Sequence, residues 1–167
     1  MLRLWRRMVL ITILLALLTG CDQATKRIAT GELKSSPPRS YAGDLIRVQY
    51  SENQGAFLSM GAELPPRTRT LLFTVLTGLL LLGMLLLVLH NGRLRLLAWG
   101  GLVLYLGGGL GNLIDRVLNR GAVVDFLNLG LGPLRTGIFN LADVFIMVGA
   151  IGLLVAGLRS SYYKTYA

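Results

Sequence analysis

Apolar residues recur in four long runs along the chain, and polar or charged residues separate them. A helix that crosses a bilayer needs about 20 predominantly apolar residues. The runs 70–92 and 96–114 meet this length, whereas 8–21 and 144–158 are shorter and take in polar residues at one end. The pattern predicts an integral membrane protein, mainly α, with one membrane-embedded domain over residues 1–167. We place its four transmembrane helices at about 5–25, 69–90, 96–115 and 138–158.

Two segments between the predicted helices, at about 27–66 and 117–137, are expected outside the membrane. The first begins as irregular loop. The stretch 44–50 then alternates apolar and polar residues, which is the periodicity of a β-strand, and a Glu-Asn-Gln-Gly turn signal follows it. Residues 56–60 predict a returning strand. We therefore expect a small antiparallel sheet that rests on the outer membrane surface.

Composition supports the membrane class and restricts the chemistry. The chain is 53% hydrophobic and 15% charged, and its mean hydropathy is +0.61. The net charge of +9 is explained by basic residues that flank membrane spans, so no nucleic acid partner is expected. A single cysteine excludes an internal disulfide, and a single histidine leaves little material for a zinc site. We therefore expect neither a metal nor a cofactor.

The alternation of helix direction brings several polar residues to one membrane face. Four spans put both termini on one side, which we place in the cytoplasm. The outer ends of the first and third predicted helices and the start of the fourth then lie in one layer. The polar residues in this layer are Asp22, Asn112, Asp115, Asn140 and Asp143.

Two of these acids, Asp22 and Asp143, are drawn into the short spans. A carboxylate at the centre of a membrane helix costs about 2.5–3.5 kcal/mol, and less near its end, so both residues are candidates for function. Lys26 follows Asp22 by one helical turn. On the third helix Asn112 and Arg116 share a flank, because they are four residues apart.

A purely structural ion-pair cluster is the simplest interpretation of these charges. Asp115 would pair with Arg116 or Lys26, and Asp22 would pair with Lys26. Asp125, in a short apolar stretch of the second external segment, adds a further acid. The two bases then leave one or two carboxylates unpaired. Two such carboxylates share a proton, so that one activates water and the other polarises a carbonyl group, as in aspartic proteases.

Other chemistries lack their residues in this topology. His90 faces the cytoplasm, so no Ser-His-Asp set is available, and Cys21 lacks a histidine base. Proton-coupled transport is an alternative use of intramembrane acids. It favours acids near the middle of the bilayer and a polar path to the cytoplasm, which the second and third predicted helices do not offer.

Five segments resemble the motifs of one family in their order and spacing. They are "DQATK", "NQGAF", "GGGLGNLIDR", "VVDF" and "FNLAD". The ordered set resembles lipoprotein signal peptidase (signal peptidase II) over nearly the whole chain. The resemblance implies a multi-pass aspartyl endopeptidase of the bacterial inner membrane, with four helices and an extracytoplasmic β-cradle. Its active site lies near the extracytoplasmic face, and it removes the signal peptide from diacylglyceryl-modified prolipoproteins just before the lipidated cysteine.

The resemblance also implies roles for individual residues. Asp125 and Asp143 match the catalytic pair, and Asn112, Arg116 and Asn140 match residues that shape the peptide site. The partners it implies are prolipoprotein substrates, membrane lipids and inhibitors of the globomycin type.

Further motif residues have supporting roles by the same resemblance. They are Asp22, Lys26, Asn53 and Gly55, together with Asp115, which we interpret as a structural acid paired with a base.

Two positions depart from the family pattern. Phe57 stands one position earlier than the usual aromatic of the second motif, which on a strand turns it to the opposite face. Val144 follows Asp143 where a small or hydroxyl residue is frequent, and it would desolvate the carboxylate pair. The first departure leaves open a silent relative that binds lipopeptides without cutting them.

The end of the first apolar run also resembles a lipoprotein cleavage box at Leu18-Thr19-Gly20-Cys21. We expect no cleavage there, because Asp22, Gln23 and Lys26 belong to the first motif of an uncut helix.

Overall fold

The computed structural model describes residues 2–56, 59–91 and 94–165, with side chains between 5 and 159. In these ranges four helices are long and apolar enough to cross a membrane, which confirms the predicted fold class. The helical elements are α1 (Leu2–Leu33), α2 (Pro66–Arg69), the π-helix η2 (Thr70–Leu76), α3 (Thr77–His90), α4 (Leu96–Leu118) and α5 (Leu141–Thr165).

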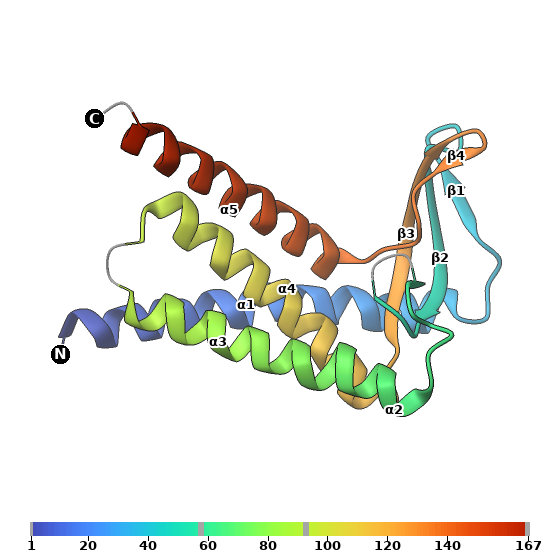
Figure 1. Ribbon diagram of the computed structural model, residues 1–167. Helices are drawn as coiled ribbons and strands as arrows, with labels where there is room; N and C mark the ends of the chain where they lie inside the picture. Colours follow the sequence, from blue (N-terminus) through green and yellow to red (C-terminus); the bar gives the residue numbers. More distant parts are fainter. Residues whose placement is uncertain (1, 57–58, 92–93, 166–167) are drawn as a thin grey trace.

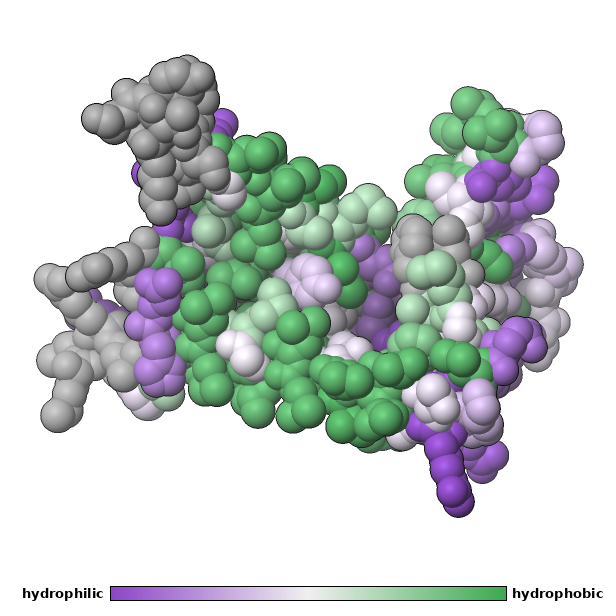
Figure 2. Space-filling model, in the orientation of Figure 1, coloured by the Kyte–Doolittle hydropathy of each residue, from purple (hydrophilic) through white to green (hydrophobic). Residues whose placement is uncertain are grey.

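The helix α4 is the centre of the bundle. It packs most extensively against α5, then against α1 and α3, whereas α1 and α3 barely touch each other. Figure 1 shows the start of α1 and the end of α5 at one end of the bundle, and the sheet across the opposite end. Apolar side chains cover the flank of the bundle, while polar ones gather over the sheet (Figure 2).

The first helix continues beyond its predicted end near residue 25. Ala29 and Leu33, one turn apart, are buried against Phe126 beneath the sheet. Burial of these two side chains stabilises about two further turns of helix. Residues 27–33 are therefore helix instead of the predicted loop. At the other boundaries, α4 runs three residues further than predicted, and α5 begins at Leu141 instead of 138.

The predicted small antiparallel sheet is confirmed, but its pairing differs from the expectation. In the described ranges its strands are β1 (Arg39–Tyr41), β2 (Ile46–Asn53), β3 (Val123–Leu131) and β4 (Leu134–Arg135), in that order. The strand β2 pairs with β3 from the second external segment, with Ser51 opposite Asp125.

The predicted returning strand at 56–60 is wrong for the part that the structure describes. Ala56 donates its N–H to the carbonyl of Met60 at 2.8 Å, and Ser59 donates to Ala56 at 3.1 Å. These local bonds close a turn and leave no free edge for strand pairing. Phe57, whose shifted position set the sequence apart, lies outside the described residues.

Small residues let α4 and α5 approach each other closely. A Cβ built on Gly101 would lie 2.9 Å from the carbonyl oxygen of Gly149, and one on Gly149 would lie 2.7 Å from the oxygen of Gly101. Such contacts between backbones are a usual basis of helix association in membranes. Further along α4, nearer the polar residues, a Cβ on Gly108 would collide with the carbonyl group of Ala142 at the start of α5.

Substitution at this crossing tests the packing. We expect Gly149→Ala to cost about 1–3 kcal/mol, because a side chain there forces α5 away from α4. Gly157→Ala on the same helix is the matched control, since a Cβ there meets nothing within 4 Å. Thermal unfolding in detergent should show a lower Tm for the first variant only. Equal Tm values would contradict the close approach.

Candidate active site

The site lies where one end of the helix bundle meets the sheet. All ten residues predicted from the sequence belong to one hydrogen-bonded network at this end of the bundle. They are Asp22 and Lys26 of α1, Asn53 and Gly55 at the end of β2, Asn112, Asp115 and Arg116 of α4, Asp125 of β3, and Asn140 and Asp143 at the start of α5.

Lys26 is the buried cation of this network. Its side chain is 3% exposed, and its Nζ lies 2.8 Å from Asp22 Oδ2 and 3.1 Å from Asp115 Oδ2. It also donates to Asn112 Oδ1 at 2.8 Å. Asp22 and Asp115 therefore share one base, as the ion-pair interpretation of the sequence allowed. Buried charges require such partners, because an unpaired charge in the interior is very costly.

The two acids that bind Lys26 also hold the backbone on either side of the site. Asp22 Oδ1 accepts the N–H of Ala142 at 2.9 Å, which fixes the first turn of α5. Asp115 Oδ2 accepts the N–H of Val124 at 3.0 Å, which fixes β3. Ala142 precedes Asp143, and Val124 precedes Asp125. The ion cluster therefore positions the backbone of both remaining acids.

Those remaining acids are held by amide groups instead of cations. Asp125 accepts from Asn140 Nδ2 at 2.6 Å through one oxygen and from Asn53 Nδ2 at 3.1 Å through the other. Asp143 accepts from Asn112 Nδ2 at 2.9 Å and from the backbone N–H of Asn140 at 3.0 Å. Among the described residues neither carboxylate forms an ion pair.

Asn140 joins the two carboxylates, and it does so as the N-cap of α5. Its Oδ1 accepts the N–H of Asp143 at 3.0 Å, and its own N–H donates to Asp143 Oδ2 at 3.0 Å. This reciprocal pair is a capping box, which also explains why α5 begins at Leu141. The side-chain amide nitrogen of Asn140 donates to Asp125 at 2.6 Å. One fully buried side chain therefore sets the position of both acids.

The environment of Asp125 changes its acidity. Burial, and after it the negative charge of Asp143, raise the pKa of Asp125 from 3.8 to about 7, against the opposing hydrogen bonds from Asn53 and Asn140. Near neutral pH Asp125 therefore exists in both its protonated and its ionised form.

Arg116 connects α4 to the turn that follows β2. It donates to the carbonyl of Gly55 at 3.0 Å, and its Nε is buried with no hydrogen-bond partner among the described atoms. A Cβ on Gly55 would collide with the carbonyl group of Ser59 at 2.6 Å, so the turn requires glycine here. The guanidinium group therefore ties α4 to this turn.

Two supporting residues lie outside the ten site residues: Gln23, which the sequence placed in the first motif without a role in the site, and Gly111. Gln23 donates to Asp115 Oδ1 at 2.7 Å and to the carbonyl of Gly111 at 3.1 Å. A Cβ on Gly111 would collide with Asp22 Oδ2. The polar character of Gln23 inside an apolar helix was a usable signal, whereas the need for glycine at 111 depends on the helix contact. Val144 is 37% exposed, so it lies outside the buried layer around the carboxylates.

Fold and site together define a polytopic membrane protein with a carboxylate pair, one member buried and the other half-buried, at one end of its helix bundle. The model of the signal peptidase (SPase) II family matches residues 14–159. The chain therefore belongs to the signal peptidase II family, which is a family of proteases.

Relatives and solved structures agree with this assignment. The lipoprotein signal peptidase of Streptococcus pneumoniae is 31% identical, over 92% of this chain and 95% of its own length. That of Azoarcus is 36% identical, over 93% of this chain and 86% of its own. A solved bacterial membrane enzyme superposes with a TM-score of 0.80 at 25% identity, over 92% of this chain and 90% of the other.

Removal of the buried cation tests the ion cluster. We expect Lys26→Met to cost about 3–5 kcal/mol, because it leaves Asp22 and Asp115 buried without a base. Lys34→Met is the matched control, since its pair with Glu52 is exposed and should matter little. Unfolding in mixed micelles compares the two. A Lys26→Met variant as stable as Lys34→Met would show that the cluster does not hold the fold.

Proposed function

We propose that the protein is an intramembrane aspartyl endopeptidase. It removes the signal peptide from diacylglyceryl-modified prolipoproteins and cuts just before the lipidated cysteine. The observation that carries this proposal is the pair of buried Asp125 and half-buried Asp143, which form no ion pair among the described residues and are joined through Asn140. The membership of the signal peptidase II family and the names of the curated relatives support the substrate.

The proton balance of the pair assigns the two roles. Asp125, with a pKa of about 7, supplies a proton to the carbonyl oxygen of the scissile bond. Asp143 takes a proton from the attacking water, whose oxygen bonds to the carbonyl carbon. The tetrahedral intermediate then collapses: the proton on Asp143 passes to the leaving nitrogen, and a hydroxyl proton returns to Asp125. The pair ends the cycle in its starting protonation state.

The surrounding groups keep this chemistry in place. Asn112, Asn53 and Asn140 orient the carboxylates without neutralising them, which a cation partner would do. Arg116, tied to the carbonyl of Gly55, steadies a substrate carbonyl or the segment that carries Asp125. Preorganised donors around a site of developing charge are a main source of catalysis.

The same proposal sets the orientation in the cell. The protein spans the bacterial inner membrane with both termini in the cytoplasm, and the site faces the extracytoplasmic side. The signal helix of the substrate enters from the bilayer, and its lipid chains stay there. Inhibitors of the globomycin type are expected to occupy the same site.

Substitution of either acid tests the mechanism. We expect Asp125→Asn and Asp143→Asn each to slow cleavage by about 10²–10⁴-fold, which is the usual contribution of a general acid or base. The readout is a gel shift of a diacylglyceryl-modified prolipoprotein, incubated with purified protein in detergent or lipid. Glu63→Gln, an exposed acid outside the site, should cleave like the parent. Undiminished cleavage by either aspartate variant would exclude the proposed pair.

The pH dependence of the rate follows from the pKa of Asp125. Since Asp125 must carry a proton, the rate should fall as the pH rises through about 7. The hydrogen bond from Asn53 lowers this pKa. Asn53→Ala should therefore move the alkaline limb of the pH–rate profile to higher pH. Single-turnover rates across the pH range measure both effects. A limb that stays in place or moves to lower pH would argue against Asp125 as the donor.

A further inference from the structure

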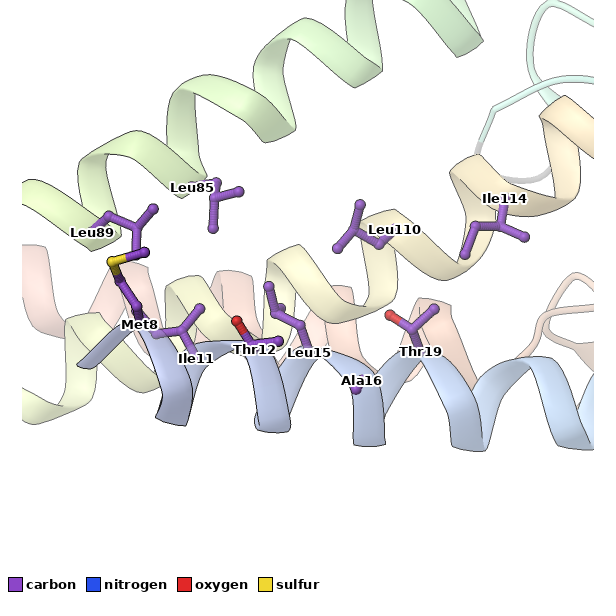
Figure 3. A pocket seen from close by; sticks show the side chains of 10 residues that line it. All are labelled: Met8, Ile11, Thr12, Leu15, Ala16, Thr19, Leu85, Leu89, Leu110 and Ile114. Atoms are coloured by element: carbon purple, nitrogen blue, oxygen red, sulfur yellow. The ribbon is translucent and has the colours of Figure 1, made fainter. Parts of the chain in front are cut away.

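An apolar groove separates α1 from α3 within the membrane-spanning part of the bundle. Figure 3 shows its lining side chains on α1, α3 and α4. Its volume is ≈ 400 Å³, which falls within the range of about 300–1,000 Å³ usual for ligand pockets. The groove exists because α1 and α3 both pack on α4 but barely on each other.

The groove lies on the opposite side of α4 from the carboxylate pair. Leu110 and Ile114 line the groove, whereas Asn112 and Arg116 belong to the site. Two residues along an α-helix differ by about 200° around its axis. The groove is therefore separate from the site of peptide cleavage.

The length of the groove suits a linear apolar chain. Met8 and Leu89 lie at one end, and Thr19 and Ile114 lie at the other (Figure 3). Thr19 lies eleven positions after Met8, which is about 16 Å along α1, or about half the 30 Å hydrocarbon core and so the depth of one leaflet. The Thr19 hydroxyl donates to the carbonyl of Gly107 at 3.1 Å, so it does not present an unsatisfied polar group to the groove.

A basic residue lies at the end formed by Met8 and Leu89. Arg7 is one turn before Ile11, which lines the groove. Its guanidinium donates to the carbonyl of Asn91, just beyond α3, at 2.7 Å. Arg7 therefore spans the mouth between α1 and α3 and has further N–H donors in its planar fork.

This end of the bundle carries no acid to balance that charge. Residues 1–21, 66–114 and 144–167 contain no aspartate or glutamate. The first acid on α1 is Asp22, which lies about 22 Å along the helix from Arg7. An apolar groove one leaflet deep, with an unbalanced arginine at its mouth, matches an acyl chain joined to a phosphate.

We propose that the groove binds one acyl chain of an anionic phospholipid, with its phosphate held at Arg7. The site is additional to peptide cleavage and takes its ligand from the leaflet on the side of the helix termini. A bound chain fills the space between α1 and α3 up to Thr19, one turn before Asp22 and Gln23. The lipid therefore holds α1 in place where the ion cluster begins.

Native mass spectrometry of the full chain in detergent tests the headgroup. The probes are phosphatidylglycerol and phosphatidylcholine with the same acyl chains, added in equal amounts. We expect about five-fold preferential retention of phosphatidylglycerol, which corresponds to about 1 kcal/mol for one basic residue at an anionic headgroup. Arg7→Gln should abolish the preference, and Arg159→Gln, at the same end but on α5, should keep it. Equal retention of both lipids by the parent, or equal loss in both variants, would overturn the proposal.

A second pair of variants tests the binding of the acyl chain independently of charge. Ala16 lines the groove, so Ala16→Leu should fill it and cause loss of both lipids. Ala150→Leu on the exposed face of α5 is the matched control and should retain them. Unchanged retention by Ala16→Leu would mean that the lipid binds elsewhere on the bundle.

Discussion

One buried lysine shared between two aspartates organises the end of the helix bundle that meets the sheet. Lys26 lies deep between α1 and α4, where a lone charge would be prohibitively costly, so Asp22 and Asp115 must both accompany it. Each acid has a second oxygen or lone pair that binds a backbone N–H, at Ala142 and Val124. The cluster that stabilises the ends of the helices therefore also positions the start of α5 and the strand β3.

The four acids of this region divide into two kinds according to their partners. Among the described residues, Asp22 and Asp115 bind a cation, whereas Asp125 and Asp143 accept hydrogen bonds only from amide groups, and on this basis we propose the second two as the catalytic pair. Asparagine suits the second task because its amide orients a carboxylate without supplying a charge. Family membership is shown by the comparisons, and this division is the physical argument for the proposed aspartyl mechanism.

The sequence was most informative where the bilayer itself constrains the chain. The length of apolar runs predicted four spans, and the alternation of their direction predicted that Asp22, Asn112 and Asp143 converge. The sequence did not predict features that depend on contacts formed only in the folded chain. The extra turns of α1 depend on burial of Leu33 beneath the sheet, and the partner of β2 lies some seventy residues further along the chain. Asn140 lies inside the predicted helix of 138–158, whereas in the structure it precedes α5 and forms a capping box with Asp143.

The most direct test of the account is the protonation of Asp125 in the folded protein. Infrared difference spectra recorded across neutral pH report protonated carboxyl groups. We expect a carboxyl band that disappears with a midpoint at about pH 7 and is absent from Asp125→Asn. In Asp143→Asn the midpoint should move to lower pH, because the neighbouring negative charge is gone. A band that persists in Asp125→Asn, or no band near neutral pH in the parent, would contradict the shared-proton pair.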